Sequence, residues 1–316
     1  MGKLRQATRA KAKIRLGLSA VSGGGKTMSA LLIAKGICGD LSKVALIDTE
    51  NGSGDLYAHI GNYNVLPLES DFTPEKYINA IHECEDAGME VIIIDSITHE
   101  WDGKGGILDI SNSMTGNSYT NWAKLTPRHQ AFIDAILQSK CHIITTVRRK
   151  QDYEMTTNSQ GKLVPQKVGL KEVTREGFEY ELTVNLELDT KHYASASKDR
   201  TGLFIGKPEF IPSEETGKLI IQWCETGVDE SAAITDAVTK LASCNTVDEL
   251  SALKIELPSF VIQSPQFIAT AKERYKVIIA QKKTDAPAQT QNGLTDEEKA
   301  EIAKEEADLF KQSNKK

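Results

Sequence analysis

The chain has 316 residues, of which 40% are hydrophobic, and a net charge of −6. This length suffices for one large domain with a smaller one beside it, and the acidic balance argues against a protein that coats nucleic acid through its overall charge. The five cysteines are odd in number and scattered, so they indicate neither a disulfide framework nor a zinc knuckle.

The N-terminal residues 1–13 are basic and contain no acid, which predicts either a solvated arm or a segment that helps to hold nucleic-acid phosphates. This segment lacks the apolar core of a signal peptide, and no apolar run in the chain is long enough to span a membrane. We therefore expect a cytoplasmic protein without a membrane partner.

A glycine-rich turn, AVSGGGKT at residues 20–27, joins an apolar strand to an amphipathic helix. It matches the P-loop pattern G-x-x-x-x-G-K-[ST], except that Ala20 replaces the first glycine. In a P-loop the backbone N–H groups bind phosphate, the lysine adds a positive charge and the threonine hydroxyl binds Mg²⁺. The sequence therefore predicts a site for ATP and Mg²⁺ in the segment Ser22, Gly23, Gly24, Gly25, Lys26, Thr27, Met28.

Apolar runs and helical patterns alternate from residue 14 to residue 147, which predicts a parallel sheet covered by helices on both faces. One helix is expected to begin at Thr126–Pro127. Asp95 ends the run VIIID and is the expected Walker B acid that holds Mg²⁺. Glu50 follows the second strand and is the candidate for activating water, with Asp48 and Glu100 as competitors.

The pattern changes after Val147, where a turn signal between extended runs predicts an exposed hairpin or a long loop. The segments that follow alternate apolar and polar residues, which predicts antiparallel strands at one edge of the sheet. We expect a basic arm at 1–13, an ATPase domain at 14–227, a helical module at 228–282, and a polar linker with a charged helix at 283–316.

The segment VALIDTENGSGDLYA resembles the second-strand segment of RecA recombinases, in which Asp-x-Glu ends the strand and a tyrosine follows. The resemblance implies that Glu50 is the catalytic glutamate and that Tyr57 stacks on adenine. IIIDSIT is similar to the RecA-type Walker B segment, and SASKDRTG is similar to an element that reaches the γ-phosphate of a neighbouring subunit. Lys198 and Arg200 would then act in trans within a homo-oligomeric ring or filament.

Over residues 3–225 the chain is similar to phage and prophage RecA-like ATPases of the single-strand annealing recombinase type. This resemblance implies an α/β fold with a RecA-like P-loop core, a mostly parallel sheet, antiparallel edge hairpins and a small helical C-terminal segment. It also implies single-stranded DNA as a partner and a single-strand binding protein as a further one. Thr145 and Thr146 stand where RecA has a glutamine that senses the γ-phosphate, and Arg148 is a candidate for that role.

DNA contacts in such proteins come from loops at the carboxyl ends of the strands, which correspond here to residues 102–121 and 148–177. The second loop carries basic residues suited to phosphate contacts without base readout, the candidates being Arg148, Arg149, Lys150, Lys162, Lys167. The expected function is an Mg²⁺-dependent ATPase that acts on single-stranded DNA in recombination, annealing or replication. A RecA-fold helicase or loader and a small-molecule P-loop kinase are the alternatives.

Overall fold

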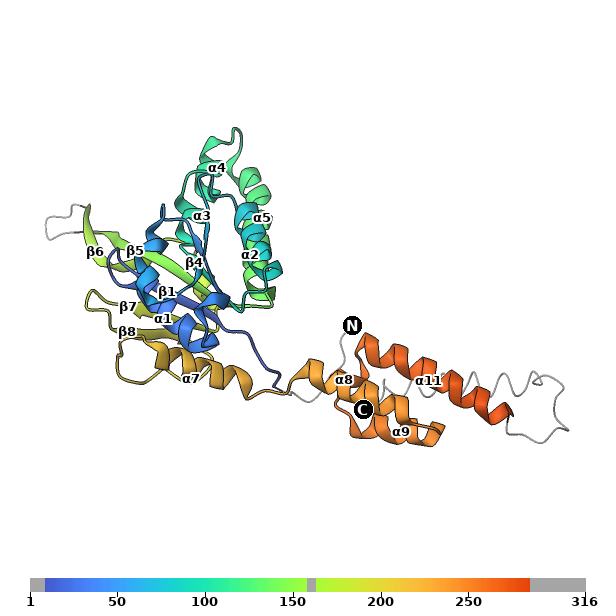
Figure 1. Cartoon of the computed structure of the whole chain (residues 1–316). Helices are drawn as coiled ribbons and strands as arrows, with labels where there is room; N and C mark the ends of the chain where they lie inside the picture. The colour runs from blue at the N-terminus through green and yellow to red at the C-terminus, as the bar shows by residue number, and fades with distance from the viewer. Residues whose placement is uncertain (1–8, 158–162, 285–316) are drawn as a thin grey trace. The chain divides into compact units, whose positions relative to one another are not determined.

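The computed structural model describes residues 9–157 and 163–284, which divide into two compact units (Figure 1). Residues 12–225 form the larger unit apart from the gap at 158–162, and the described residues of the smaller unit are 9–11 and 226–284. The larger unit has a mixed α/β fold with a mostly parallel central sheet and antiparallel strands at its edge. The fold class expected from the sequence is therefore confirmed.

The central sheet has the strand order β3-β2-β4-β5-β1-β7-β8, and β6 pairs only with β5. All neighbouring pairs from β3 to β7 are parallel, whereas β7–β8 and β5–β6 are antiparallel. The strands are β1 (Arg15–Ala20), β2 (Val44–Asp48), β3 (Asn64–Pro67), β4 (Val91–Asp95), β5 (His142–Thr157), β6 (Leu163–Glu172), β7 (Val184–Leu188) and β8 (Ala194–Asp199).

Helices cover both faces of this sheet, which explains why every residue of β1, β2 and β4 is buried and most of them are apolar. On one face, α1 (Lys26–Cys38) and α7 (Glu214–Glu225) pack on a core that includes Ile93. On the other face, α2 (Pro74–Asp86) and α5 (Ser118–Gln138) pack on a core that includes Ile92 and Ile94. Successive residues of β4 thus face opposite cores, as the two-residue period of a strand requires.

Helix α5 begins eight residues earlier than the sequence predicts, so the prediction of a helix start at Thr126–Pro127 is wrong. The helix begins where the Asn117 side chain accepts a hydrogen bond from the Tyr119 N–H, and Pro127 lies inside it. Asn121 and Leu125 are buried in the added turns, and this burial outweighs the missing proline donor. The expected loop at 102–121 likewise contains a helix, α4 (Ile107–Ser113).

Short helical segments connect the main elements of the larger unit: η1 (Leu41–Lys43), η2 (Ser53–Ile60), α3 (Thr98–Asp102) and α6 (Phe178–Glu181). Strand β5 is long because its first part lies in the central sheet and its second part forms a hairpin with β6. One strand therefore runs from the buried sheet into the hairpin that carries most of the basic residues expected to bind DNA.

The smaller unit is helical and has its own apolar core, built around Leu241, Phe267 and Tyr275. Its helices are α8 (Glu230–Ser243), α9 (Val247–Glu256), α10 (Ser259–Ile262) and α11 (Pro265–Thr284). Among the helices of the described residues, none is long and apolar enough to cross a bilayer.

Candidate nucleotide site

A cavity of about 540 Å³ lies at the carboxyl edge of the sheet, where β1, β2 and β4 end. Its volume falls within the range of about 300–1,000 Å³ that is typical of small-ligand sites. The walls come from the P-loop, the turn after β2, the end of β4 and two later segments. The residues predicted to bind nucleotide, metal or water that line it are Ser22, Gly23, Gly25, Lys26, Thr27, Met28, Glu50, Tyr57 and Asp95.

The P-loop backbone depends on its glycines in two different ways. Gly23 and Gly25 have φ values of 78° and 81°, a left-handed conformation that side chains disfavour. Gly24 is required by packing, because a Cβ at this position would lie 2.7 Å from the Ala20 Cβ. The alanine that replaces the first glycine of the pattern is thus accommodated by the absence of a side chain at Gly24, whose N–H donates to the Val21 carbonyl at 3.1 Å.

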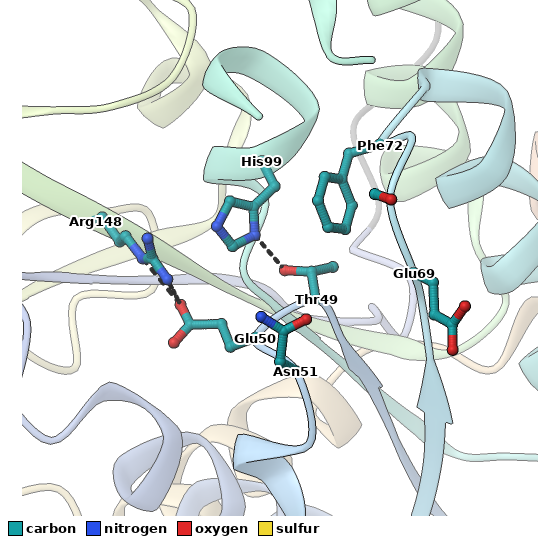
Figure 2. A pocket seen from close by; sticks show the side chains of 8 residues that line it. Thr49, Glu50, Asn51, Glu69, Phe72, His99 and Arg148 are labelled. Atoms are coloured by element: carbon teal, nitrogen blue, oxygen red, sulfur yellow. Dashed lines mark hydrogen bonds and ion pairs between the residues drawn. The ribbon is translucent and has the colours of Figure 1, made fainter. Parts of the chain in front are cut away.

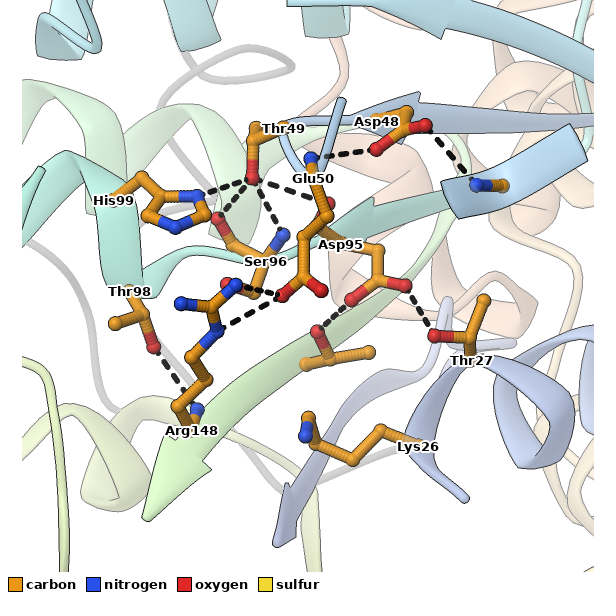
Figure 3. Close-up of polar contacts among 12 residues, drawn as sticks. Lys26, Thr27, Asp48, Thr49, Glu50, Asp95, Ser96, Thr98, His99 and Arg148 are labelled. Carbon is orange, nitrogen blue, oxygen red and sulfur yellow. Dashed lines mark hydrogen bonds and ion pairs between the residues drawn. The ribbon is translucent and has the colours of Figure 1, made fainter. Parts of the chain in front are cut away.

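Lys26, Thr27 and Asp95 meet at the base of the cavity (Figure 3). The Thr27 hydroxyl donates to Asp95 Oδ2 at 2.5 Å, and the Thr146 hydroxyl donates to Asp95 Oδ1. Burial raises the pKa of Asp95, and the two hydroxyl donors oppose that shift. Burial also lowers the pKa of Lys26, against the raising effect of the nearby Asp95 and Glu50 charges.

Of the three acids considered for activating water, Glu50 is the one that lines the cavity. Asp48 instead holds the turn that carries Glu50: its Oδ1 accepts from the Glu50 N–H at 2.6 Å and its Oδ2 from the Gly54 N–H at 3.1 Å. Glu100 is 1% exposed and is bonded to His129 Nδ1 at 3.0 Å, so it belongs to the packing of α3 against α5. The geometry therefore separates one cavity-lining carboxylate from two structural ones.

Arg148 lies in this cavity, although the sequence groups it with basic residues expected to bind DNA. Its Nε and NH2 groups donate to Glu50 Oε1 at 3.0 and 2.8 Å (Figure 3). Arg148 is paired with Ala20 in the β1–β5 register, next to the start of the P-loop. The γ-phosphate-sensing role considered for Arg148 is therefore compatible with its position.

Tyr57 lies on η2 at the apolar part of the cavity, together with Leu56 and Ile211. Leu56 is 75% exposed and Ile211 56%, a surface that suits a flat, partly apolar group such as a nucleobase. His192 is a cavity residue that sequence reasoning missed. A Cβ at Gly25 would lie 2.5 Å from its Nδ1. Its position follows from the pairing of β7 with β1, which brings the turn between β7 and β8 to the P-loop.

Lys198 and Arg200 do not reach the cavity of their own chain. The Lys198 ammonium donates to the carbonyls of Glu179 and Tyr180, and Arg200 NH2 donates to the Tyr180 carbonyl at 3.0 Å. Burial and the Arg200 charge lower the pKa of Lys198. The action in trans expected for these two residues stays a prediction.

Three of the remaining DNA-binding candidates, Arg149, Lys150 and Lys167, are in the β5–β6 hairpin. Arg149 NH1 is bonded to Glu187 at 2.8 Å, and Lys150 Nζ to Asp102 at 2.8 Å. Lys167 is in β6, opposite Tyr153 in the strand register. Lys162 lies outside the described residues.

The family model for an AAA domain matches residues 12–211, from just before β1 to Ile211, which lines the cavity. The chain belongs to the AAA domain family. Comparison with curated proteins found no match. This AAA domain is accordingly a P-loop ATPase domain, of a kind that generally uses ATP and Mg²⁺.

Proposed function

We propose that the AAA domain binds and hydrolyses ATP with Mg²⁺, in the cavity at the carboxyl edge of its sheet. The observation that carries the proposal is that one cavity collects a P-loop lysine and threonine, a strand-terminal aspartate and the glutamate that follows the neighbouring strand. These groups come from three parts of the sequence that only the parallel sheet brings together. Tyr57 at the apolar part supports a nucleobase as the other end of the ligand.

The donor set at the base of the cavity fits Mg²⁺, since this ion prefers oxygen ligands. Thr27 and Asp95 are the residues that would hold it, directly or through water, because their oxygens are already 2.5 Å apart. When bound, the ion would neutralise charge on the β- and γ-phosphate oxygens. Lys26 would bind the same phosphates, and the Glu50 carboxylate would orient and deprotonate the attacking water.

Two substitutions test this assignment in a steady-state ATPase assay. Lys26→Ala should abolish turnover through loss of phosphate binding, whereas Glu50→Gln should bind ATP and not hydrolyse it. The control is Glu75→Gln, which alters an exposed carboxylate on α2 that is bonded to Arg128. Unchanged turnover in the Glu50 variant would remove this residue from the proposed role.

The partner we propose is single-stranded DNA, in phage-type recombination, annealing or replication within a bacterial cytoplasm. Support comes from the basic residues of the β5–β6 hairpin and from its continuity with the strand that carries Arg148. Because one strand connects the hairpin to the cavity residue Arg148, DNA bound at the hairpin would stimulate ATP hydrolysis. ATPase rate and DNA binding measured together over a salt series are the test, and a lack of binding at low salt would refute the DNA role.

A homo-oligomer is proposed because Lys198 and Arg200 do not line the cavity of their own chain and are bonded to backbone carbonyls of α6 instead. Mixing Lys26→Ala chains with Arg200→Ala chains should restore activity at mixed interfaces, since each supplies what the other lacks. No recovery on mixing would argue against action in trans.

A cognate single-strand binding protein is a further proposed partner, to be tested by co-sedimentation of the two purified proteins.

A further inference from the structure

The turn between β7 and β8 holds His192 in a backbone conformation that side chains disfavour. The turn is a three-residue loop, 190–192, closed by the Asp189 N–H, which donates to the Tyr193 carbonyl at 2.9 Å. His192 is the last residue of this loop and has a φ of 70°. Hairpin loops of this length ordinarily place glycine at the left-handed position. A histidine there points to a role for its side chain.

The backbone of His192 is fixed from within the turn. Its N–H donates to the Asp189 carbonyl at 3.1 Å, and Asp189 Oδ1 accepts from the N–H groups of Lys191 and Tyr193 at 2.8 and 2.9 Å. The residue is exposed, and its imidazole has no hydrogen-bond partner among the residues that the structure describes. The ring nitrogens are therefore available to a ligand.

The imidazole lies over Gly25, the residue that caps the N-terminus of α1. A Cβ at Gly25 would lie 2.5 Å from Nδ1 and 3.3 Å from each of the ring carbons bonded to it, so this edge of the ring fills the room that a side chain would need. The first N–H groups of a helix have no acceptor within the helix and bind anions readily. The ring therefore lies beside the N–H groups that a P-loop offers to phosphate.

His192 and Arg148 reach the nucleotide cavity from opposite sides of the P-loop. Strand β1, which leads into the loop, lies between β5, which carries Arg148, and β7, which precedes the His192 turn. Glu50 and Arg148 also line a second cavity of about 620 Å³ together with Phe72, and His192 is not among its lining residues (Figure 2). Because the attacking water is expected on the Glu50 side, His192 faces the phosphate that the P-loop itself holds.

We propose that His192 is a phosphate-binding residue, whose ring N–H donates to an oxygen of the phosphate held by the P-loop. The inference rests on the proposed function, because it takes this cavity as the nucleotide site. ADP and ATP share that phosphate, so the contact is made equally before and during hydrolysis and adds affinity without adding to catalysis. The same residue should therefore lower the stability of the empty turn and raise the affinity for the ligand.

The test substitutes His192→Gly in the full chain and measures affinities for ADP and for a non-hydrolysable β,γ-imido analogue of ATP, both with Mg²⁺, by calorimetry. Both affinities should weaken by the same factor of about ten, the lower end for a hydrogen bond to a charged group. In the ATPase assay KM should rise while kcat stays within about twofold. The urea midpoint of unfolding should be at least that of the wild type, because glycine adopts a φ of 70° without strain.

Two further measurements locate the contact. Inorganic pyrophosphate with Mg²⁺, used to displace a fluorescent ADP, should lose affinity by the same factor, because it carries phosphate and no nucleoside. Lys191→Ala is the matched control, since it removes an exposed side chain from the same turn and keeps the backbone N–H that bonds to Asp189. The control should leave all three affinities within about twofold.

Several results would overturn the inference: an unchanged ADP affinity in His192→Gly, weakening confined to the triphosphate analogue, or an unchanged pyrophosphate affinity. A fall in the urea midpoint together with the affinities would also overturn it, because the ring would then support the P-loop rather than bind the ligand. A wild-type chain that binds neither nucleotide would instead refute the proposed function.

Discussion

The packing of Ala20 against Gly24 leads to a prediction about P-loop stability. A Cβ added at Gly24 would lie 2.7 Å from the Ala20 Cβ and 3.2 Å from the Val21 carbonyl oxygen. Gly24 lacks the left-handed backbone of Gly23 and Gly25, so Gly24→Ala tests packing without added backbone strain. Overpacking of this kind costs about 1–3 kcal/mol, which we expect as the loss in free energy of unfolding.

Removing the opposing methyl group should recover much of that loss. Ala20→Gly alone should cost about 1–2 kcal/mol, from backbone entropy in a strand and a lost buried methyl. The double variant should then be more stable than the sum of the two losses by about 0.5–3 kcal/mol, the coupling typical of residues in contact. Gly23→Ala is the control, since it has a φ of 78° and no neighbour within 4 Å, so Ala20→Gly should not rescue it.

Urea unfolding followed by tryptophan fluorescence is the suitable assay. The chain has three tryptophans, and all of them lie within residues 12–225, so the signal reports the larger unit. This matters because a chain of two units need not unfold in a single transition. Strictly additive losses, or a Gly24→Ala variant as stable as the wild type, would refute the packing argument.

Three further predictions concern buried polar groups. Burial holds the pKa of His142 at about 3, so its contribution to stability is present above pH 6.5 and is lost on acidification toward pH 3. His142→Asn should therefore flatten the dependence of unfolding free energy on pH between about 6 and 4, as read from urea titrations. Arg15→Met should cost at least about 3 kcal/mol in the same assay, because several buried carbonyls, including that of Cys141 at 2.8 Å, lose their donor. Thr146→Val should cost about 1.5–3 kcal/mol at neutral pH, because the Asp95 carboxylate loses a hydroxyl donor.

The sheet and the main cavity could be predicted because their signals are local. Buried parallel strands need unbroken apolar runs, and a P-loop needs a specific set of residues at a strand-to-helix turn. Asp95 ends one such run, and Glu50 lies two residues beyond the end of another. The start of α5 could not be predicted in this way, because burial of Asn121 and Leu125 depends on the packing of the whole unit.

His192 could not be placed from the sequence because its position depends on strand order. It lies in the turn between β7 and β8, and only the pairing of β7 with β1 brings that turn to Gly25. Arg148 illustrates a second limit. The sequence assigns Arg148 to DNA binding because residues 148–150 are all basic, and three consecutive positive charges suggest a single phosphate-binding patch.

The strand period divides that basic run between different partners. In β5 successive side chains point to opposite faces, so Arg148 and Arg149 cannot serve one surface. Arg148 is bonded to Glu50, Arg149 to Glu187 on β7, and Lys150 to Asp102. Each phosphate contact with single-stranded DNA adds about 0.7 to the salt slope. If the run acted as one patch it would add about 2, whereas Lys150 alone, with Arg148 bonded to Glu50 and Arg149 to Glu187, would add about 0.7. A slope that Lys150→Ala lowers by about 0.7, and that Arg148→Ala leaves unchanged, would assign Lys150 to DNA and Arg148 to the nucleotide.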